Sequence, residues 1–171
     1  TVSAGTSTLG SAVVVTNALI ATGGTLNTSA VFSFAVTAGT VTIGASGILT
    51  ANASTITVNG NFTSNAGTFT PGTSTLTLAA TGTLDLTGDS AYSLTINASV
   101  TTTFVANPTI SNVFTLNGVV AATNSPSVTL TGATADPFVL GGAGDASNLV
   151  LGYRASVDYN VVGTTYRGLS I

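Results

Sequence analysis

The stretch Thr75-Leu-Thr-Leu78 decides the fold, because its two leucines alternate with two threonines at a period of two residues. Successive side chains of a β-strand point to opposite faces, so both leucines face one side and both threonines the other. The same register, with apolar residues at the second and fourth positions, occurs at residues 40–43, 55–58, 75–78, 93–96, 113–116 and 127–130. These six segments predict strands that are buried on one face and carry mostly Ser or Thr on the other.

The six segments form an internal repeat, and their first residues are separated by steps of 15, 20, 18, 20 and 14. Turn signals such as Asn59-Gly60, Pro71-Gly72 and Asn117-Gly118 separate them from shorter strand-like segments. A unit of about 20 residues with two short strands is typical of one coil of a β-solenoid. A β-sandwich also has short strands at regular intervals, and the uneven steps leave it open as the alternative. We favour the all-β solenoid, because one four-residue register recurs six times.

Seven residue types are absent from the 171-residue chain, namely His, Cys, Met, Trp, Lys, Glu and Gln. Without His, Lys or Cys, acid–base and nucleophilic catalysis lose their usual groups, and zinc and haem lose their usual ligands. Two Arg cannot form the positive surface that a phosphate backbone requires. The sequence therefore predicts a protein that is not an enzyme, needs no cofactor and binds no nucleic acid.

The chain combines a mean hydropathy of +0.58 with 4% charged residues, where about 25% is usual for a soluble domain. Its apolar runs stay far below the roughly 18 residues of a transmembrane helix, so we expect no transmembrane segment. A net charge of −3 produces little repulsion between copies. We therefore expect the chain to associate with copies of itself as a homopolymer.

The first residue is Thr1 rather than Met. This start indicates a mature chain from which a leader has been removed, and hence an extracellular or cell-surface location. The lack of Cys fits secretion without disulfides.

Segments such as Ile56-Thr-Val-Asn-Gly-Asn-Phe-Thr63 and Gly82-Thr-Leu-Asp-Leu-Thr-Gly88 are characteristic of residues 39–132. This region resembles the Thr/Gly/Asn-rich β-helical repeats of bacterial and archaeal cell-surface proteins, of the adhesin and autotransporter-passenger type. The resemblance implies a surface or fibre role, and it carries over no functional residue.

We expect a single domain over residues 1–171, with the repeat region at 39–132. Residues 1–38 contain apolar strands outside the repeat register and include a candidate inter-subunit strand. Residues 133–171 predict a C-terminal hairpin with its turn at Gly163-Thr164. The hairpin is either a cap on the core or a contact between subunits, because edge strands are templates for another chain. Its candidate contact residues are Tyr153, Arg154, Asp158, Tyr159, Tyr166 and Arg167.

Asp85 and Asp89 are the only close carboxylates of the repeat region. Paired carboxylates can serve glycosidic chemistry, but Asp85 alternates with two leucines and is expected to face solvent, so we predict no catalytic residue. The glycine-rich segment 141–149 is similar to the calcium-binding nonapeptide of β-rolls, but it occurs only once and a glycine-rich turn explains it more simply. The weak calcium candidates are Asp136, Asp145 and Asp158.

Four Asn-x-Ser/Thr sequons occur, at Asn27, Asn52, Asn61 and Asn97. Glycan attachment at these residues is chemically allowed. However, a chain with 13 Asn and abundant Ser and Thr is expected to contain about four sequons by chance, so the count itself does not indicate glycosylation.

The hydroxyl residues of the six segments are expected to line up on the outside as a candidate assembly or ligand face. Its members are Thr40, Thr42, Thr55, Thr57, Thr75, Thr77, Thr95, Thr115 and Thr129. Flat Thr-x-Thr arrays resemble those of ice-binding β-solenoid proteins. An ordinary exposed strand surface and a packing face against another subunit are the alternatives.

Together these observations favour a non-catalytic structural subunit of an extracellular, self-assembling filament, sheath or surface layer. The alternative is a surface adhesin or binding module, which includes an ice-binding β-solenoid with a Thr-x-Thr face. An adhesin would present Tyr153, Tyr159 and Tyr166 on exposed loops.

Overall fold

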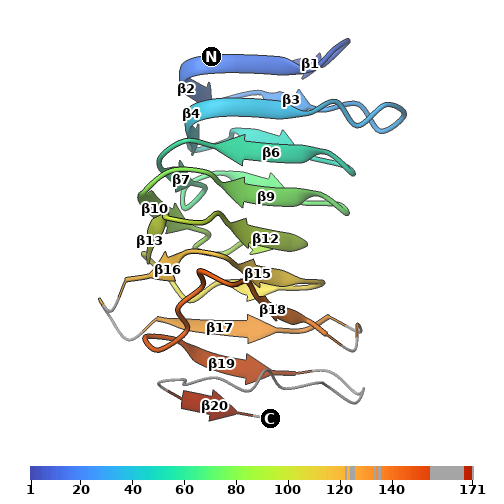
Figure 1. The fold of residues 1–171 in the computed structure, drawn as a ribbon. Helices are drawn as coiled ribbons and strands as arrows, with labels where there is room; N and C mark the ends of the chain where they lie inside the picture. The colour runs from blue at the N-terminus through green and yellow to red at the C-terminus, as the bar shows by residue number, and fades with distance from the viewer. Residues whose placement is uncertain (122, 124–125, 133, 135, 155–167, 171) are drawn as a thin grey trace.

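The computed structural model describes residues 1–121, 123, 126–132, 134, 136–154 and 168–170. These residues form β-strands and turns and contain no helix, so no helix in them could cross a membrane. The strands pair in parallel and stack as a β-solenoid of about 7 turns of roughly 20 residues. Figure 1 shows the turns stacked from the N-terminal end to the C-terminal end. The predicted all-β solenoid is confirmed.

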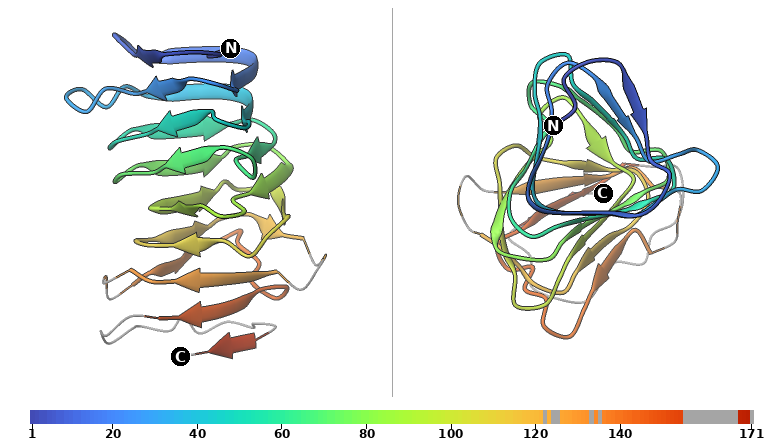
Figure 2. Two further views of the ribbon diagram at one scale, coloured as in Figure 1. Left: turned by 180° about the vertical axis from the view of Figure 1, so that it is seen from behind. Right: turned by 90° about the horizontal axis from the view of Figure 1, so that it is seen from above.

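Each turn runs around three sides, which the view along the stack in Figure 2 shows. Face 1 contains the first halves of β2 (Val13–Ala21) and β4 (Val36–Ile43), then β6 (Thr55–Val58), β9 (Thr75–Leu78), β12 (Ser93–Ile96), β15 (Phe114–Leu116) and β18 (Phe138–Leu140). Face 2 contains the second halves of β2 and β4, then β7 (Phe62–Thr63), β10 (Gly82–Asp85), β13 (Thr101–Phe104) and β16 (Val119–Val120). Face 3 contains β1 (Thr6–Thr8), β3 (Thr25–Asn27), β5 (Ile48–Thr50), β8 (Thr68–Thr70), β11 (Ser90–Ala91), β14 (Thr109–Ile110), β17 (Ser127–Leu130), β19 (Val150–Tyr153) and β20 (Gly168–Ser170).

The stack keeps its register because equivalent residues of successive turns pair directly. On face 1, Val36 pairs with Ile56, Ile56 with Leu76, Leu76 with Leu94 and Leu94 with Phe114. All five side chains point inward and are fully buried. Burying each large apolar side chain contributes about 1.5–3 kcal/mol, so this column holds the turns together.

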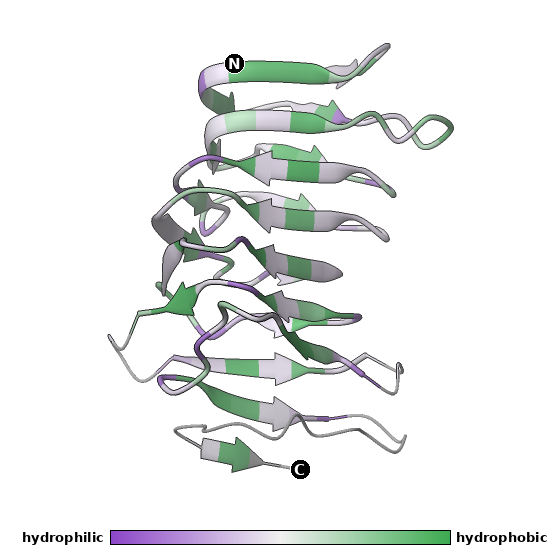
Figure 3. Cartoon of the chain, in the orientation of Figure 1, coloured by the Kyte–Doolittle hydropathy of each residue, from purple (hydrophilic) through white to green (hydrophobic). Residues whose placement is uncertain are grey.

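A one-residue slip would turn the whole inward column of face 1 out to solvent, and this fixes the pairing. Figure 3 shows the resulting alternation of apolar and hydrophilic residues along the strands. Aromatic rings also pack against one another in the core. The rings of Phe62 and Phe69 meet edge to face at 5.1 Å, and those of Phe114 and Phe138 lie 5.4 Å apart.

The six predicted segments do not form one continuous stack, because they belong to three different faces. Segments 55–58, 75–78, 93–96 and 113–116 lie above one another on face 1. Segment 40–43 lies on face 2, where Val41 pairs with Phe62, and segment 127–130 lies on face 3. The first and last steps between the segments, which are the shortest in the sequence, therefore mark a change of face and not a shorter turn.

Glycines occur at corners where the backbones of adjacent turns approach closely. A Cβ atom on Gly82 would lie 2.5 Å from the carbonyl oxygen of Gly60 in the turn before it, and one on Gly118 would lie 2.4 Å from that of Asn97. Such distances leave no room for a methyl group. These glycines are therefore required by the stacking of the turns.

Candidate interaction surfaces

A straight row of threonines runs along the outer side of face 1, and we call it the threonine file. It consists of Thr37, Thr57, Thr77, Thr95 and Thr115, and each residue pairs directly with the next. Beside it, Thr55, Thr75 and Ser93 form a shorter second row. All of these side chains are partly or fully exposed.

The threonine file presents hydroxyl and methyl groups on a regular grid. Adjacent strands lie about 4.8 Å apart, and residues two positions apart on one strand lie about 6.7 Å apart. No Asp or Arg belongs to the five threonine-bearing segments of face 1, so the array carries no charge. An exposed valine continues the file at each end, since Val14 pairs with Thr37 and Val139 pairs with Thr115.

The threonines that were predicted to form one outer face lie on three different faces of the solenoid. Thr55, Thr57, Thr75, Thr77, Thr95 and Thr115 lie together on face 1. Thr40 and Thr42 lie on face 2, where Thr42 pairs with Thr63, and Thr129 lies on face 3 beside Thr109. Thr37 was missed, because its neighbour at the inward position is the small Ala38 and the segment lacks the four-residue register. The alternation of Val36, Thr37 and Ala38 was the available signal.

Asp85 does not face solvent, and this corrects the expectation from its alternation with two leucines. It lies at the end of β10 and is 5% exposed. Its Oδ1 accepts hydrogen bonds from the backbone N–H of Thr87 at 3.1 Å and from the hydroxyl of Thr87 at 2.7 Å. The carboxylate therefore closes a local turn at the corner after β10.

Asp89 bridges the one interruption of face 3 in the described residues. Face 3 is split into two sheets between β8 and β11, so the backbone N–H of Phe69 lacks a ladder partner on β11. The Oδ2 of Asp89 accepts that hydrogen bond at 3.0 Å. Both carboxylates of the repeat region are thus bound by donors of the protein's own turns.

The calcium candidates are not brought together among the residues that the structure describes. No group of three or more acidic, His or Cys side chains capable of holding a metal occurs there. Asp136 and Asp145 are both exposed, and Asp158 lies outside the described residues. The hydroxyl and then the backbone N–H of Ser147 hold the pKa of Asp145 below its usual value. The N–H bond to Oδ1 is 2.8 Å long.

Two of the four sequons take part in one hydrogen-bonded network. The Nδ2 of Asn52, the atom that a glycan would modify, donates to Asn27 Oδ1 at 2.9 Å and to Thr28 Oγ1 at 3.1 Å. Asn61 is exposed, and its Oδ1 accepts from the backbone N–H of Thr83 at 3.0 Å. Asn97 is half-buried. Glycan attachment stays a prediction, and Asn61 is the most accessible of the four.

The predicted C-terminal hairpin falls mostly on residues 155–167, which lie outside the described part of the chain. This includes Asp158, Tyr159, Tyr166 and Arg167. Of the other two candidate contact residues, Tyr153 is buried and Arg154 is exposed. The described strand β20 pairs in parallel with β19, with Val150 opposite Gly168. β20 therefore continues face 3 by one more strand.

The two ends of the stack present strand edges without a partner in the described residues. At the N-terminal end, β1 pairs only with β3 and β2 only with β4, although Val2 bridges Ala21 over the second half of β2. At the C-terminal end, β20 pairs only with β19 in the described part of the chain. Strongly exposed large apolar side chains gather near these ends. They are Val14, Val31 and Phe32 in the first two turns and Val139 and Leu169 in the last ones, with Val105 in between.

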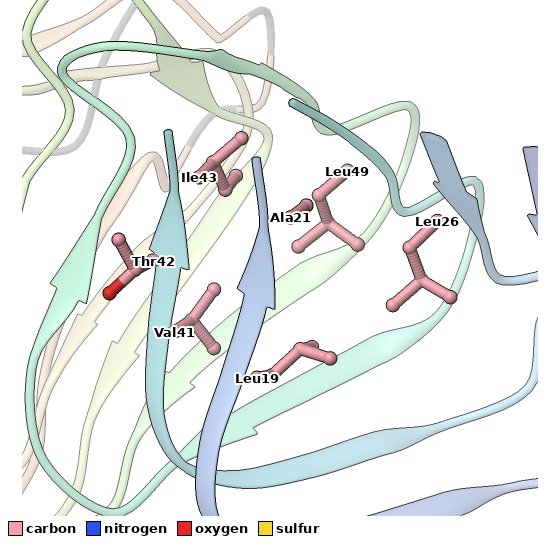
Figure 4. Close-up of a pocket in the computed structure, with 7 residues that line it drawn as sticks. All are labelled: Leu19, Ala21, Leu26, Val41, Thr42, Ile43 and Leu49. Carbon is pink, nitrogen blue, oxygen red and sulfur yellow. The ribbon is translucent and has the colours of Figure 1, made fainter. Parts of the chain in front are cut away.

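A small apolar hollow lies inside the first turns, and Figure 4 shows the side chains around it. The space between these side chains does not admit a water molecule. It is lined by Leu19, Ala21, Leu26, Val41, Thr42, Ile43 and Leu49. Ligand pockets measure roughly 300–1,000 Å³ and contain several converging polar groups. The hollow is therefore space between core side chains at the N-terminal end.

No family model, curated protein or solved structure matches this chain.

Proposed function

We propose that this chain is a non-catalytic structural subunit of an extracellular assembly, in which solenoids stack end to end into a filament, sheath or surface layer. The observation that carries the proposal is that, among the described residues, the parallel stack ends in open strand edges, at β1 and the first half of β2 on one side and at β20 on the other. The two edges differ from one another, so each can accept the opposite end of another copy. Head-to-tail contacts that repeat along one stacking axis do not close into a ring and therefore produce open filaments.

The N-terminal edge supplies backbone donors for such a contact. The N–H of Val13 points toward β4, because it donates to the carbonyl oxygen of Ala35 at 3.0 Å. Hydrogen-bonding groups alternate in direction along a strand, so the N–H of Val14 points away from β4 and toward the end of the stack. An added strand there would continue face 1 by one more parallel pair.

The composition supports the same proposal. Only 4% of the residues are charged, so little electrostatic repulsion opposes contact between copies. The proposed extracellular location and the proposed absence of catalysis rest on the sequence. The lack of Cys fits secretion without disulfides, and the lack of His and Lys removes the usual groups of acid–base catalysis.

The proposal is tested with two variants of Val14, whose side chain is 74% exposed. Val14→Pro removes the outward N–H and places the proline ring where the next strand would dock, and edge strands tolerate proline. Val14→Thr retains the N–H and reduces the apolar surface. Electron microscopy of wild-type protein and of Val14→Thr is expected to show filaments, whereas Val14→Pro is expected to remain monomeric at ten times the wild-type assembly concentration.

Below the assembly concentration, where both variants are monomeric, circular dichroism is expected to show the same melting temperature for Val14→Pro and Val14→Thr. A wild-type protein that stays monodisperse and monomeric at high concentration would refute the proposal. Filaments of Val14→Pro as abundant as those of wild type would also refute stacking through this edge.

The threonine file favours a second candidate function, a binding module for a repeating surface such as ice. The observation behind it is the unbroken pairing of Thr57, Thr77, Thr95 and Thr115. Thr57→Tyr/Thr77→Tyr is expected to abolish inhibition of ice recrystallisation, and Thr129→Tyr on face 3 is the matched control. Equal activity of both variants, or no activity of the wild type, would contradict an ice-binding role.

A further inference from the structure

The corner between β3 and β4, residues 28–35, is built differently from the equivalent corners of the following turns. Four residues, 51–54, connect β5 to β6, and four, 71–74, connect β8 to β9. Eight residues connect β3 to β4, and Figures 1 and 2 show this loop extending sideways from the stack. We call residues 28–35 the side loop. Its tip carries two of the most exposed large apolar side chains in the described residues, Val31 at 81% and Phe32 at 70%.

The base of the side loop is fixed by hydrogen bonds to its own turn and to the next one. The N–H of Phe34 donates to the carbonyl of Thr28 at 2.8 Å and closes the loop. Thr28 is fully buried, and its hydroxyl donates to the carbonyl of Ala51 at 2.7 Å. Asn27 Oδ1 accepts from the N–H of Ser29 at 2.8 Å and from Asn52 Nδ2 at 2.9 Å. The loop is therefore anchored at its base.

Two serines of the side loop have backbone conformations that side-chain-bearing residues rarely adopt. The φ angle of Ser29 is 73° and that of Ser33 is 50°. The N–H of Ser33 donates to the carbonyl of Ser29 at 2.8 Å, so both residues form one tight turn below the tip. Ser46, Asn52 and Ser99 at other corners also have positive φ angles, so this conformation belongs to the tight corners of the solenoid and here fixes the shape of the loop.

The rings of the two phenylalanines of the side loop stack on each other, and the outer ring, that of Phe32, is left largely uncovered. Their centroids are 5.4 Å apart and their planes differ by 27°. Phe34 is half-buried, whereas Phe32 leaves most of its surface in water. Holding an aromatic ring outward on an anchored loop is unfavourable unless another apolar surface covers it.

We infer that the side loop is a lateral docking site for a second copy of this chain, in which the Phe32 rings of two copies pack against each other. The inference rests on the proposed function, because it supplies the side-to-side contact between stacked solenoids. A two-fold contact of this type joins identical patches. The loop contains no charged residue, so two loops meet without electrostatic repulsion.

The contact is small, which indicates that the partner copy belongs to an assembly and is not a single free molecule. A Phe ring buries about 150–250 Å², so two exposed Phe32 rings contribute on the order of 300 Å². A stable complex buries roughly 1,200–2,000 Å² in total. A single pair of side loops is therefore weak, and many pairs along two neighbouring filaments would act together. A membrane is a poorer partner, because the loop has no Lys or Arg for anionic headgroups.

The natural absence of Cys allows a direct test by cross-linking. Ala30→Cys places one thiol at the exposed tip while retaining Val31 and Phe32, and Ala98→Cys places one on an exposed turn after β12 as the control. With a short bismaleimide, Ala30→Cys is expected to form covalent dimers at least tenfold faster than Ala98→Cys. Adding Phe32→Ser to Ala30→Cys is expected to lower the rate to that of the control. Phe32 is exposed, so the melting temperature should not change.

Cross-linking of Ala30→Cys at the control rate would overturn the inference, whether or not filaments form. Fast cross-linking that Phe32→Ser does not reduce would overturn it as well, because the ring would not be the contact. Binding of wild-type protein to phosphatidylcholine vesicles that Phe32→Ser abolishes would assign the loop to lipid and would also overturn it. Filaments of Ala30→Cys that cross-link only at the control rate would overturn the side-loop contact and leave end-to-end stacking standing, whereas an absence of filaments would refute the stacking itself, which separates the two proposals.

Discussion

The middle and the ends of this solenoid are built by the same strand pairing, yet they differ in regularity. From Val36 to Phe114, equivalent positions of face 1 recur at an almost constant step along the chain. The step from Val13 to its partner Val36 and the step from Phe114 to its partner Phe138 are both longer than any step between them. In the first of these steps, the connection between β3 and β4 has eight residues and the register of β2 against β4 shifts between Val15 and Ala18.

The alternation of apolar and hydroxyl residues has different consequences in the middle turns and in the end turns. In the middle turns, alternation of apolar and hydroxyl residues buries a continuous column and leaves an uncharged threonine file outside. In the end turns, the alternation is weaker and large apolar side chains such as Val14, Phe32 and Val139 are exposed. The regularity of the middle turns serves stability, and under the proposed function the exposed apolar side chains of the end turns would serve contacts with other copies.

The largest difference that we expect between the middle and the end turns is in the free energy of unfolding lost when an inward-facing side chain is truncated. Leu76 is fully buried between Ile56 and Leu94, so Leu76→Ala should lower the free energy of unfolding by about 2–5 kcal/mol. Val13 has one strand neighbour and is only partly buried, so Val13→Ala should cost about 1 kcal/mol or less. Denaturant titration of both variants measures the contrast, and equal losses would contradict it.

A somewhat smaller effect is expected at the glycine corners. Gly82→Ala would bring its Cβ within 2.5 Å of the Gly60 carbonyl oxygen and should destabilise the protein by about 1–3 kcal/mol. A Cβ on Gly10 meets nothing within 4 Å, so Gly10→Ala should change stability by about 0.5 kcal/mol or less. Thermal unfolding of the two variants compares a middle corner with an end corner. A neutral Gly82→Ala would show that the turns stack less closely than described.

The hydrogen bond between Asp89 and Phe69 spans the break in face 3 of the described residues, and two variants of Asp89 measure how much it stabilises the middle turns. Asp89→Ala leaves the N–H of the buried Phe69 without its 3.0 Å acceptor and should cost about 1–3 kcal/mol. Asp89→Asn retains a carbonyl oxygen in the same place and should restore most of that loss. If the Asn variant is as unstable as the Ala variant, the hydrogen bond to Phe69 is not the reason for the effect.

The smallest expected effect is a pH dependence near the C-terminal end. Ser147 holds the pKa of Asp145 below its usual value, so the ionised form of this carboxyl is favoured in the folded chain. Its contribution to stability is present above the ordinary carboxyl pKa and is lost as the pH falls through the lowered folded pKa. The group is exposed, so the contribution is small. Ser147→Ala should raise the pKa of Asp145 in an NMR titration, and an unchanged pKa would contradict the assignment.

The fold class followed from the sequence because the alternation of period two is a local property. Residues 75–78 are a strand whether they lie in a sandwich or a solenoid, and the recurrence of their register along the chain selected the solenoid. The assignment of strands to faces did not follow, because segments 40–43 and 127–130 obey the same alternation on other faces. Pairing between turns is a long-range property that a four-residue pattern does not contain.

The interaction surfaces were predictable in part. The threonine file could be expected from the inward and outward alternation, except for Thr37. The side loop could not, since Val31 and Phe32 are apolar and their sequence suggests a buried strand. Their exposure depends on the turn at Ser29 and Ser33 and on the anchor of Thr28 in the next turn. The burial of Asp85 could not be predicted from its alternation with two leucines either, because it depends on the turn that follows it.

The central claim is that solenoids join end to end, and the direction of the strands in the assembled material tests it most directly. Strands of adjacent turns lie about 4.8 Å apart along the stack, so end-to-end joining places this spacing along the filament axis. Diffraction from aligned wild-type filaments is therefore expected to give a strong reflection at about 4.8 Å on the meridian. A reflection at about 4.8 Å on the equator, which places the stacking direction of the turns across the filament axis, would contradict the account.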